Sequence, residues 1–154
     1  MPEEDVLQRA REDAREGKSS STQAGEFVRE EIEHVRSGKH GARNVKQAIA
    51  MGLSKARRAG VYLPPPGAGS SPQIRRKAAR DIRKARTPRK PSKTRSRAVS
   101  DALKRESRRT TSRQALSRQG RAALHRRGAS AGRRSARRAA RTRRRSARSR
   151  RRSS

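Results

Sequence analysis

The sequence predicts an all-α protein, in which a small helical head precedes basic helices and an arginine-rich tail. Apolar residues recur at helical spacing between residues typical of helix caps. They make up 28% of the 154 residues, whereas a globular domain has roughly half, so we expect at most one small core. Both aromatic residues and most of the valines fall within residues 1–63, where that core is expected.

The first two helices of the head are predicted from their end signals. Residues 2–15 form the first, with a proline at its first position and Gly17 as a left-handed cap. The second begins at Ser20 or Thr22 and ends at Gly38. Its acidic residues are expected to form a solvated face, and they are Glu26, Glu30, Glu31 and Glu33.

The third helix is predicted between Asn44, which can cap its start, and Gly60, which can end it. Its apolar and small residues fall within one arc of about 140°, and they are Val45, Ala48, Ile49, Gly52, Leu53 and Ala56. Basic residues project away from the centre of this arc. We therefore expect one side of the helix to pack on its neighbours and the other to meet a partner.

The remaining chain divides by composition. The head covers residues 1–61, and residues 62–71, rich in proline, glycine and serine, are predicted to be a linker. Residues 72–127 contain a helix from Pro72 to Arg86 and two weaker ones, which we expect to form when a polyanion neutralises them. Residues 128–154 contain 12 arginines and are expected to be disordered alone.

Charge is distributed very unevenly along the chain. Residues 1–33 carry ten acids and five bases, net −5, whereas residues 34–154 carry 40 bases and three acids, net +37. Such a segment requires a polyanion. The two aromatic residues, Phe27 and Tyr62, both precede the basic region, which argues against stacking on single strands. We therefore predict sequence-nonspecific binding to double-stranded DNA, with RNA as the alternative.

The candidate phosphate contacts are cations presented in pairs or on helix faces. In the head they are Lys46, Lys55, Arg57 and Arg58; in the basic region Arg75, Arg76, Arg80, Arg89 and Lys90; and in the tail Arg133, Arg134, Arg137, Arg138, Arg143, Arg144 and Arg145. Thr87-Pro88-Arg89-Lys90 is similar to a turn of linker-histone tails that enters the minor groove, but a simple helix breaker in a basic linker is the favoured interpretation.

No pattern predicts catalysis. The chain has no cysteine, no phosphate loop and no nucleophile motif, so we expect no enzyme and no cofactor. His34, His40 and His125 are expected to be isolated, which predicts no metal site. The absence of an 18-residue apolar run and the acidic start predict a cytoplasmic, nucleoid location without a membrane partner.

Residues 38–60, GKHGARNVKQAIAMGLSKARRAG, resemble a segment of small, basic, uncharacterised bacterial proteins, some of which are described as histone-like. The C-terminal half is similar to linker-histone-like and protamine tails in composition. The resemblance implies a bacterial source. With the charge, it favours a histone-like nucleoid protein that neutralises and compacts or bridges DNA, with the head as a candidate homodimer surface.

Two alternatives stay open at this level. An RNA- or ribosome-binding protein would also combine a small head with basic extensions. In the second alternative, the acidic residues 1–33 fold back on the tail and compete with DNA for it.

Overall fold

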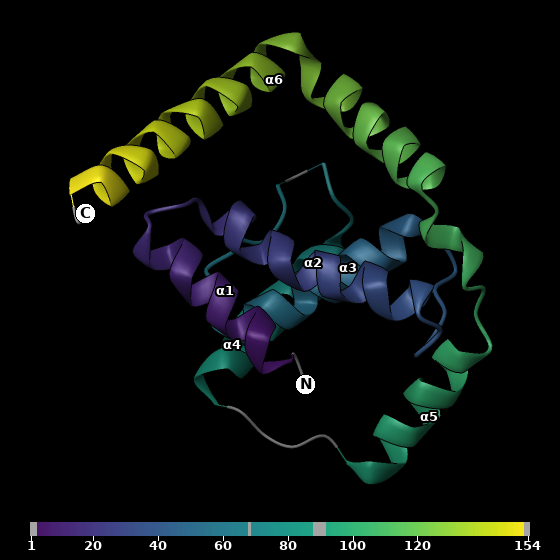
Figure 1. Cartoon of the computed structure of the whole chain (residues 1–154). Coiled ribbons are helices and arrows are strands. Elements are labelled where there is room, and N and C mark those ends of the chain that lie inside the picture. The colour runs from purple at the N-terminus through teal and green to yellow at the C-terminus, as the bar shows by residue number, and fades with distance from the viewer. Residues whose placement is uncertain (1–2, 68, 88–91, 153–154) are drawn as a thin grey trace.

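The computed structural model of the chain describes residues 3–67, 69–87 and 92–152. Within these ranges all regular structure is helical, which confirms the predicted all-α class. The elements are α1 (Glu4–Arg15), α2 (Ser20–Arg36), α3 (Val45–Arg58), α4 (Pro72–Arg86), α5 (Lys93–Lys104), the 3-10 turn η1 (Arg109–Thr111) and α6 (Arg113–Arg152). Figure 1 shows α1 to α4 gathered together, while α5 and α6 extend around them.

Local signals in the sequence set most helix ends. The Asn44 side chain accepts a hydrogen bond from the Gln47 amide at 2.9 Å, as its predicted cap role requires. Three helices end at a glycine of positive φ, namely Gly17, Gly38 and Gly60. The residue after each glycine donates its amide to a carbonyl five positions back, at 2.9, 2.9 and 3.0 Å, which closes the helix end. At α2 the capping side chain is Ser19, one position before the earliest predicted start.

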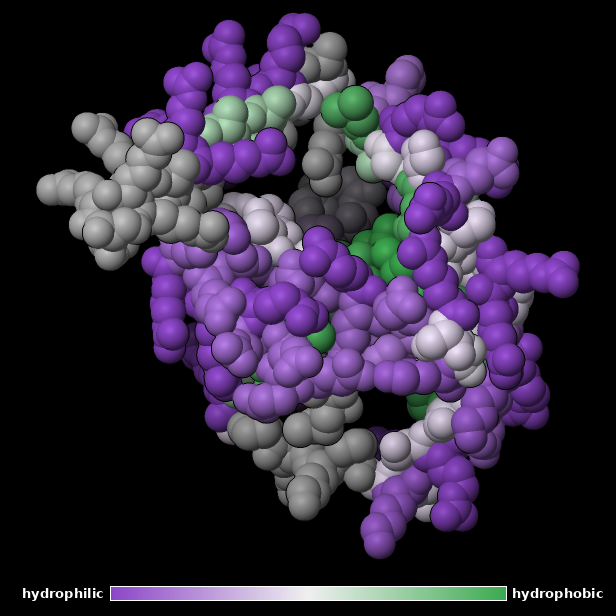
Figure 2. Space-filling view, viewed as in Figure 1, coloured by the Kyte–Doolittle hydropathy of each residue, from purple (hydrophilic) through white to green (hydrophobic). Residues whose placement is uncertain are grey.

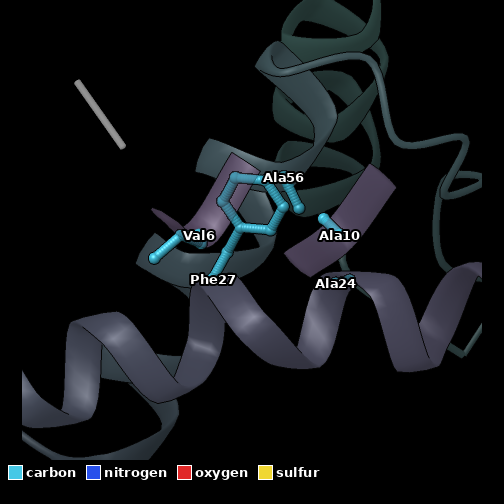
Figure 3. Close-up of a cluster of buried hydrophobic side chains, with 5 residues drawn as sticks. All are labelled: Val6, Ala10, Ala24, Phe27 and Ala56. Atoms are coloured by element: carbon cyan, nitrogen blue, oxygen red, sulfur yellow. The ribbon is translucent and has the colours of Figure 1, made fainter. Parts of the chain in front are cut away.

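The core is small and rich in alanine. The Phe27 ring lies between α1, α2 and α3 and is fully buried (Figure 3). The side chains packed with it are Val6, Ala10, Ala24 and Ala56. A second cluster beside it consists of Val35, Ala42 and Ala48, with Met51 against it. Alanine side chains bury little apolar area, so close approach of the helices matters more here than in a core of large residues.

Gly52 is the point of closest approach between α2 and α3. A Cβ atom at this position would lie 2.6 Å from the Val28 Cα atom and 2.9 Å from the Phe27 carbonyl oxygen. Both atoms belong to the backbone of α2, so no side-chain movement could relieve the contact. A glycine is therefore required where these helices cross.

α4 packs on α3, although residues 62–71 separate them. Ala78 and Asp81 of α4 are buried, and the Ser54 hydroxyl of α3 donates to the Asp81 carboxylate at 2.5 Å. The packed part of the protein thus continues beyond the segment predicted to be a linker. That segment returns the chain to α3, and Arg57 donates to the Leu63 carbonyl oxygen at 3.3 Å.

Residues 103–111 pack on the loop between α2 and α3. The Gly41 amide donates to the Leu103 carbonyl at 2.8 Å, and the Ala42 amide to the Ser107 carbonyl at 3.0 Å. A Cβ atom on Gly41 would lie 1.9 Å from the Glu106 carbonyl oxygen, so only glycine fits. Thr111 in η1 is buried, and its carbonyl accepts from the Arg36 guanidinium at 3.3 Å.

α6 consists of two straight arms that meet at Gly128, whose backbone is not helical (φ 74°, ψ 157°; Figure 1). The helix contacts α3 and η1. No side chain of α6 that the structure describes is buried. Residues 129–152 therefore have helical backbone without a core to hold it, and disorder of the tail in the absence of a partner stays a prediction.

Replacing Gly52 with alanine should destabilise the head by about 1–3 kcal/mol, because the added methyl group forces α2 and α3 apart. Urea denaturation followed by circular dichroism measures the change. Gly25→Ala is the matched control, since a Cβ atom at this position of α2 would meet no neighbouring atom within 4 Å. It should stabilise the protein by up to about 1 kcal/mol through helix propensity. Equal effects of both substitutions would contradict the close approach of α2 and α3 at Gly52.

Candidate nucleic-acid interface

A basic groove of about 780 Å³ lies between α3, α4, α5 and the loop after α2. Its cationic side chains are Lys39, Lys55, Arg58, Lys77, Arg80 and Lys84. Of the predicted phosphate contacts, the structure brings Lys55, Arg58 and Arg80 together here. Lys39, Lys77 and Lys84 join them, and sequence patterning alone did not single them out. Figure 2 shows that hydrophilic side chains cover most of the face visible there.

The acidic residues of α2 are not all solvated, so the prediction of a solvated face is wrong for two of them. Glu30 is 6% exposed and Glu31 is 2% exposed. The Lys55 ammonium of α3 contacts both, at 3.2 Å from Glu30 Oε2 and in direct contact with Glu31 Oε1. Two buried carboxylates would repel each other strongly without this cation. Lys55 therefore pairs with carboxylates inside the head and is less available to bind phosphate than the sequence predicted.

Arg57 and Arg58 are also engaged within the fold. Arg57 donates to the Leu63 carbonyl, and burial lowers the pKa of its guanidinium, an effect that Asp81 opposes. Arg58 donates to the Ser54 carbonyl at 3.2 Å and lies 3.9 Å from Asp81 Oδ1. These two arginines therefore hold the end of α3 to the chain that follows. Their side chains are therefore less available to an external partner than their position on a basic helix face predicted.

The other predicted contacts divide by exposure. Lys46 on α3 and Arg76 and Arg80 on α4 are exposed. Arg75 donates to the Ser70 carbonyl at 3.2 Å. Arg89 and Lys90, with the turn motif that contains them, lie outside the described residues.

The second arm of α6 carries the remaining predicted contacts. Six of them are exposed on this arm, and they are Arg133, Arg134, Arg137, Arg138, Arg143 and Arg144. Arg145 belongs to the same helix, but its side chain is outside the described part. The helix contains 17 arginines and no acidic residue. Over 40 residues at about 1.5 Å each, this is roughly one positive charge per 3.5 Å.

The start of α1 is tied to α2 and to the loop after it by Glu3. Its carboxylate accepts hydrogen bonds from Lys39 at 2.6 Å and from His34 Nε2 at 3.1 Å. These bonds, with the charge of Lys39, lower the pKa of Glu3 to about 2. The Glu3 amide donates to Glu30 Oε1 at 2.8 Å. Glu3 and Glu30 thus pair with cations of the head and of the loop after α2.

His34 and His40 are not isolated, contrary to the prediction. Their rings lie edge to face with centroids 5.8 Å apart, and both are beside the buried Glu31 carboxylate. Glu31 precedes His34 by three positions, one helical turn, and this spacing was visible in the sequence. The approach of His40 depends on the chain reversal at Gly38, which brings the following loop back over α2.

Residues 14–66 match a protein family whose description is a family of unknown function, DUF6496. The match runs from the end of α1 through α3 and includes the whole of residues 38–60. No curated protein and no solved structure matches the chain. In the described ranges, no helix combines the length and the apolar character needed to cross a membrane.

Replacing Lys55 with alanine should destabilise the head by about 3 kcal/mol, because two buried carboxylates lose their shared cation. Lys46→Ala on the same helix is the matched control. Its side chain is exposed, so its effect should stay within about 0.5 kcal/mol. Urea midpoints at neutral pH measure both. A Lys55 variant as stable as the Lys46 variant would show that the pairing does not hold α2 to α3.

Proposed function

We propose that this chain is a histone-like nucleoid protein that binds double-stranded DNA without sequence preference. The observation that carries the proposal is the charge of α6, which has 17 arginines and no acidic residue. Its spacing of roughly one positive charge per 3.5 Å is close to the phosphate spacing of about 3.4 Å along one DNA strand. Guanidinium groups bind phosphate oxygens through paired hydrogen bonds, and each contact releases condensed counterions.

Several acids of the head are already paired with cations of the head, which supports this function. Within the head, Arg9 pairs with Glu26, Lys18 pairs with Asp13, and Lys55 pairs with Glu30. These acids are thus occupied by nearby cations, which argues against a head that folds over the tail and competes with DNA. The basic groove adds Lys77, Arg80 and Lys84 beside the head as a second phosphate-binding surface.

The bend at Gly128 gives α6 two arms of different direction. Each arm is long enough to follow phosphates over several base pairs. Two arms on separate stretches of duplex would bridge them, and two arms on one stretch would neutralise it. Compaction of DNA in the cytoplasm, at the nucleoid, is the expected consequence in either case.

The salt dependence of binding tests the proposal. Fluorescence anisotropy with 30-base-pair duplexes of two unrelated sequences, between 50 and 200 mM salt, should give equal affinities that fall steeply with salt. The triple substitution of Arg133, Arg134 and Arg137 with glutamine should reduce the slope of log K against log salt by up to about 2.7.

The control removes the same charge from the head. Arg9, Arg11 and Arg29 all pair with carboxylates there, so their replacement with glutamine should leave the slope almost unchanged. Equal losses in both triple variants would show that only net charge matters. Stronger binding to a duplex RNA or to ribosomal subunits than to DNA would overturn the proposal in favour of an RNA-binding protein.

A further inference from the structure

We propose that Glu31, His34 and His40 form a binding site for a divalent transition ion of the zinc class. One donor atom from each residue lies within 4.8 Å of the others. Imidazole and carboxylate are ligands that zinc accepts in sites with three protein ligands. None of the three ligands is a cation proposed for phosphate, although they line the same basic groove.

The spacing of the donor atoms suits a metal better than a hydrogen bond. His40 Nε2 lies 3.5 Å from Glu31 Oε2, and His34 Nδ1 lies 3.8 Å from Glu31 Oε1. Strong hydrogen bonds join such atoms at about 2.7–3.2 Å. The ligand atoms of a tetrahedral zinc ion, each about 2.0–2.1 Å from the metal, are separated by about 3.3 Å. A small closing movement of the side chains would therefore complete three coordination positions.

A hydrogen bond at the far side of each ring favours the tautomer in which the inner nitrogen is free to act as a ligand. His34 Nε2 lies 3.1 Å from Glu3 Oε1, and His40 Nδ1 lies 3.1 Å from the Gly41 carbonyl oxygen. Both oxygens can only accept from the ring, because the Glu3 carboxyl is ionised and Gly41 offers a carbonyl. In the neutral tautomer that these bonds favour, each ring N–H is directed away from Glu31 and the lone pair is directed toward it. Carboxylate and carbonyl partners of this kind orient histidine ligands in metalloproteins.

The local charge and access also suit a cation. The charged groups paired with the ligands and their immediate partners are three carboxylates, Glu3, Glu30 and Glu31, and two ammonium groups, Lys39 and Lys55, for a net charge of −1. The rest of the groove adds Arg58, Lys77, Arg80, Lys84 and Asp81. Lys55 competes with a metal for Glu31, but it can remain hydrogen-bonded to Glu30 when a metal binds Glu31. All three proposed ligands line the basic groove, which provides an entry path and room for a water ligand.

A bound ion would join α2 to the loop after it. Two ligands lie one turn apart on α2, and the third follows the chain reversal at Gly38. In a head with so small a core, ion binding to the folded state alone should raise the melting temperature.

Nitrogen-15 NMR of the histidine side chains in the full-length protein tests the site, with Zn²⁺ as the probe. One equivalent of Zn²⁺ should shift His34 Nδ1 and His40 Nε2 toward values typical of metal coordination, and leave His125 unchanged. This measurement needs no variant, so a folding defect cannot obscure it. Shifts at His125 alone, coordination through the outer nitrogens, or no shift at an excess of Zn²⁺ would overturn the proposal.

Calorimetric titration of two matched variants gives the second measurement. His40→Gln should weaken Zn²⁺ binding by more than 100-fold, because it removes a ligand rather than a supporting group. His125→Gln on α6 should bind Zn²⁺ as the unmodified chain does. Equal affinities in the two variants would contradict the assignment.

Discussion

The contact of Lys55 with Glu30 and Glu31 is the interaction on which the packed part of this protein most depends. Apolar burial is limited to a few valines, alanines and one phenylalanine, so two carboxylates inside the head would be costly without a cation between them. Their shared cation comes from α3, and it can reach them because Gly52 lets the backbones of the two helices approach. Charge pairing and close helix packing thus require each other in this head.

This pairing divides the molecule by its electrostatics. Carboxylates of the head form ion pairs with cations of the head. The chain beyond η1 contains no acidic residue. The long basic helix carries 17 arginines and no acid of its own, and it is joined to the small folded unit through η1. Self-repulsion among arginines on α6 also explains why no described side chain of that helix is buried.

Local features of the fold could be predicted from the sequence, because local contacts create them. Asn44 and the glycines at positions 17, 38 and 60 occupy the expected cap positions. The burial of Glu31 could not be predicted, since helical spacing places a carboxylate on a face without saying what covers that face. Packing of α4 on α3 could not be predicted for a related reason, because it depends on contacts such as Ser54 with Asp81, which are 27 positions apart in the sequence. The basic groove depends on both events, so the place of Lys39, Lys77 and Lys84 in it was recognised only in the structure.

The central claim is that cations paired inside the head stay there while exposed cations bind phosphate. Acetylation of lysine side chains, read by mass spectrometry with and without duplex DNA, measures this residue by residue. Exposed Lys46, Lys77 and Lys84 should react readily alone and become protected by DNA. Lys18 and Lys55, held by carboxylates, should react slowly and equally in both conditions. Reactivity of Lys55 that matches Lys77 and falls in the same way on DNA binding would contradict the account.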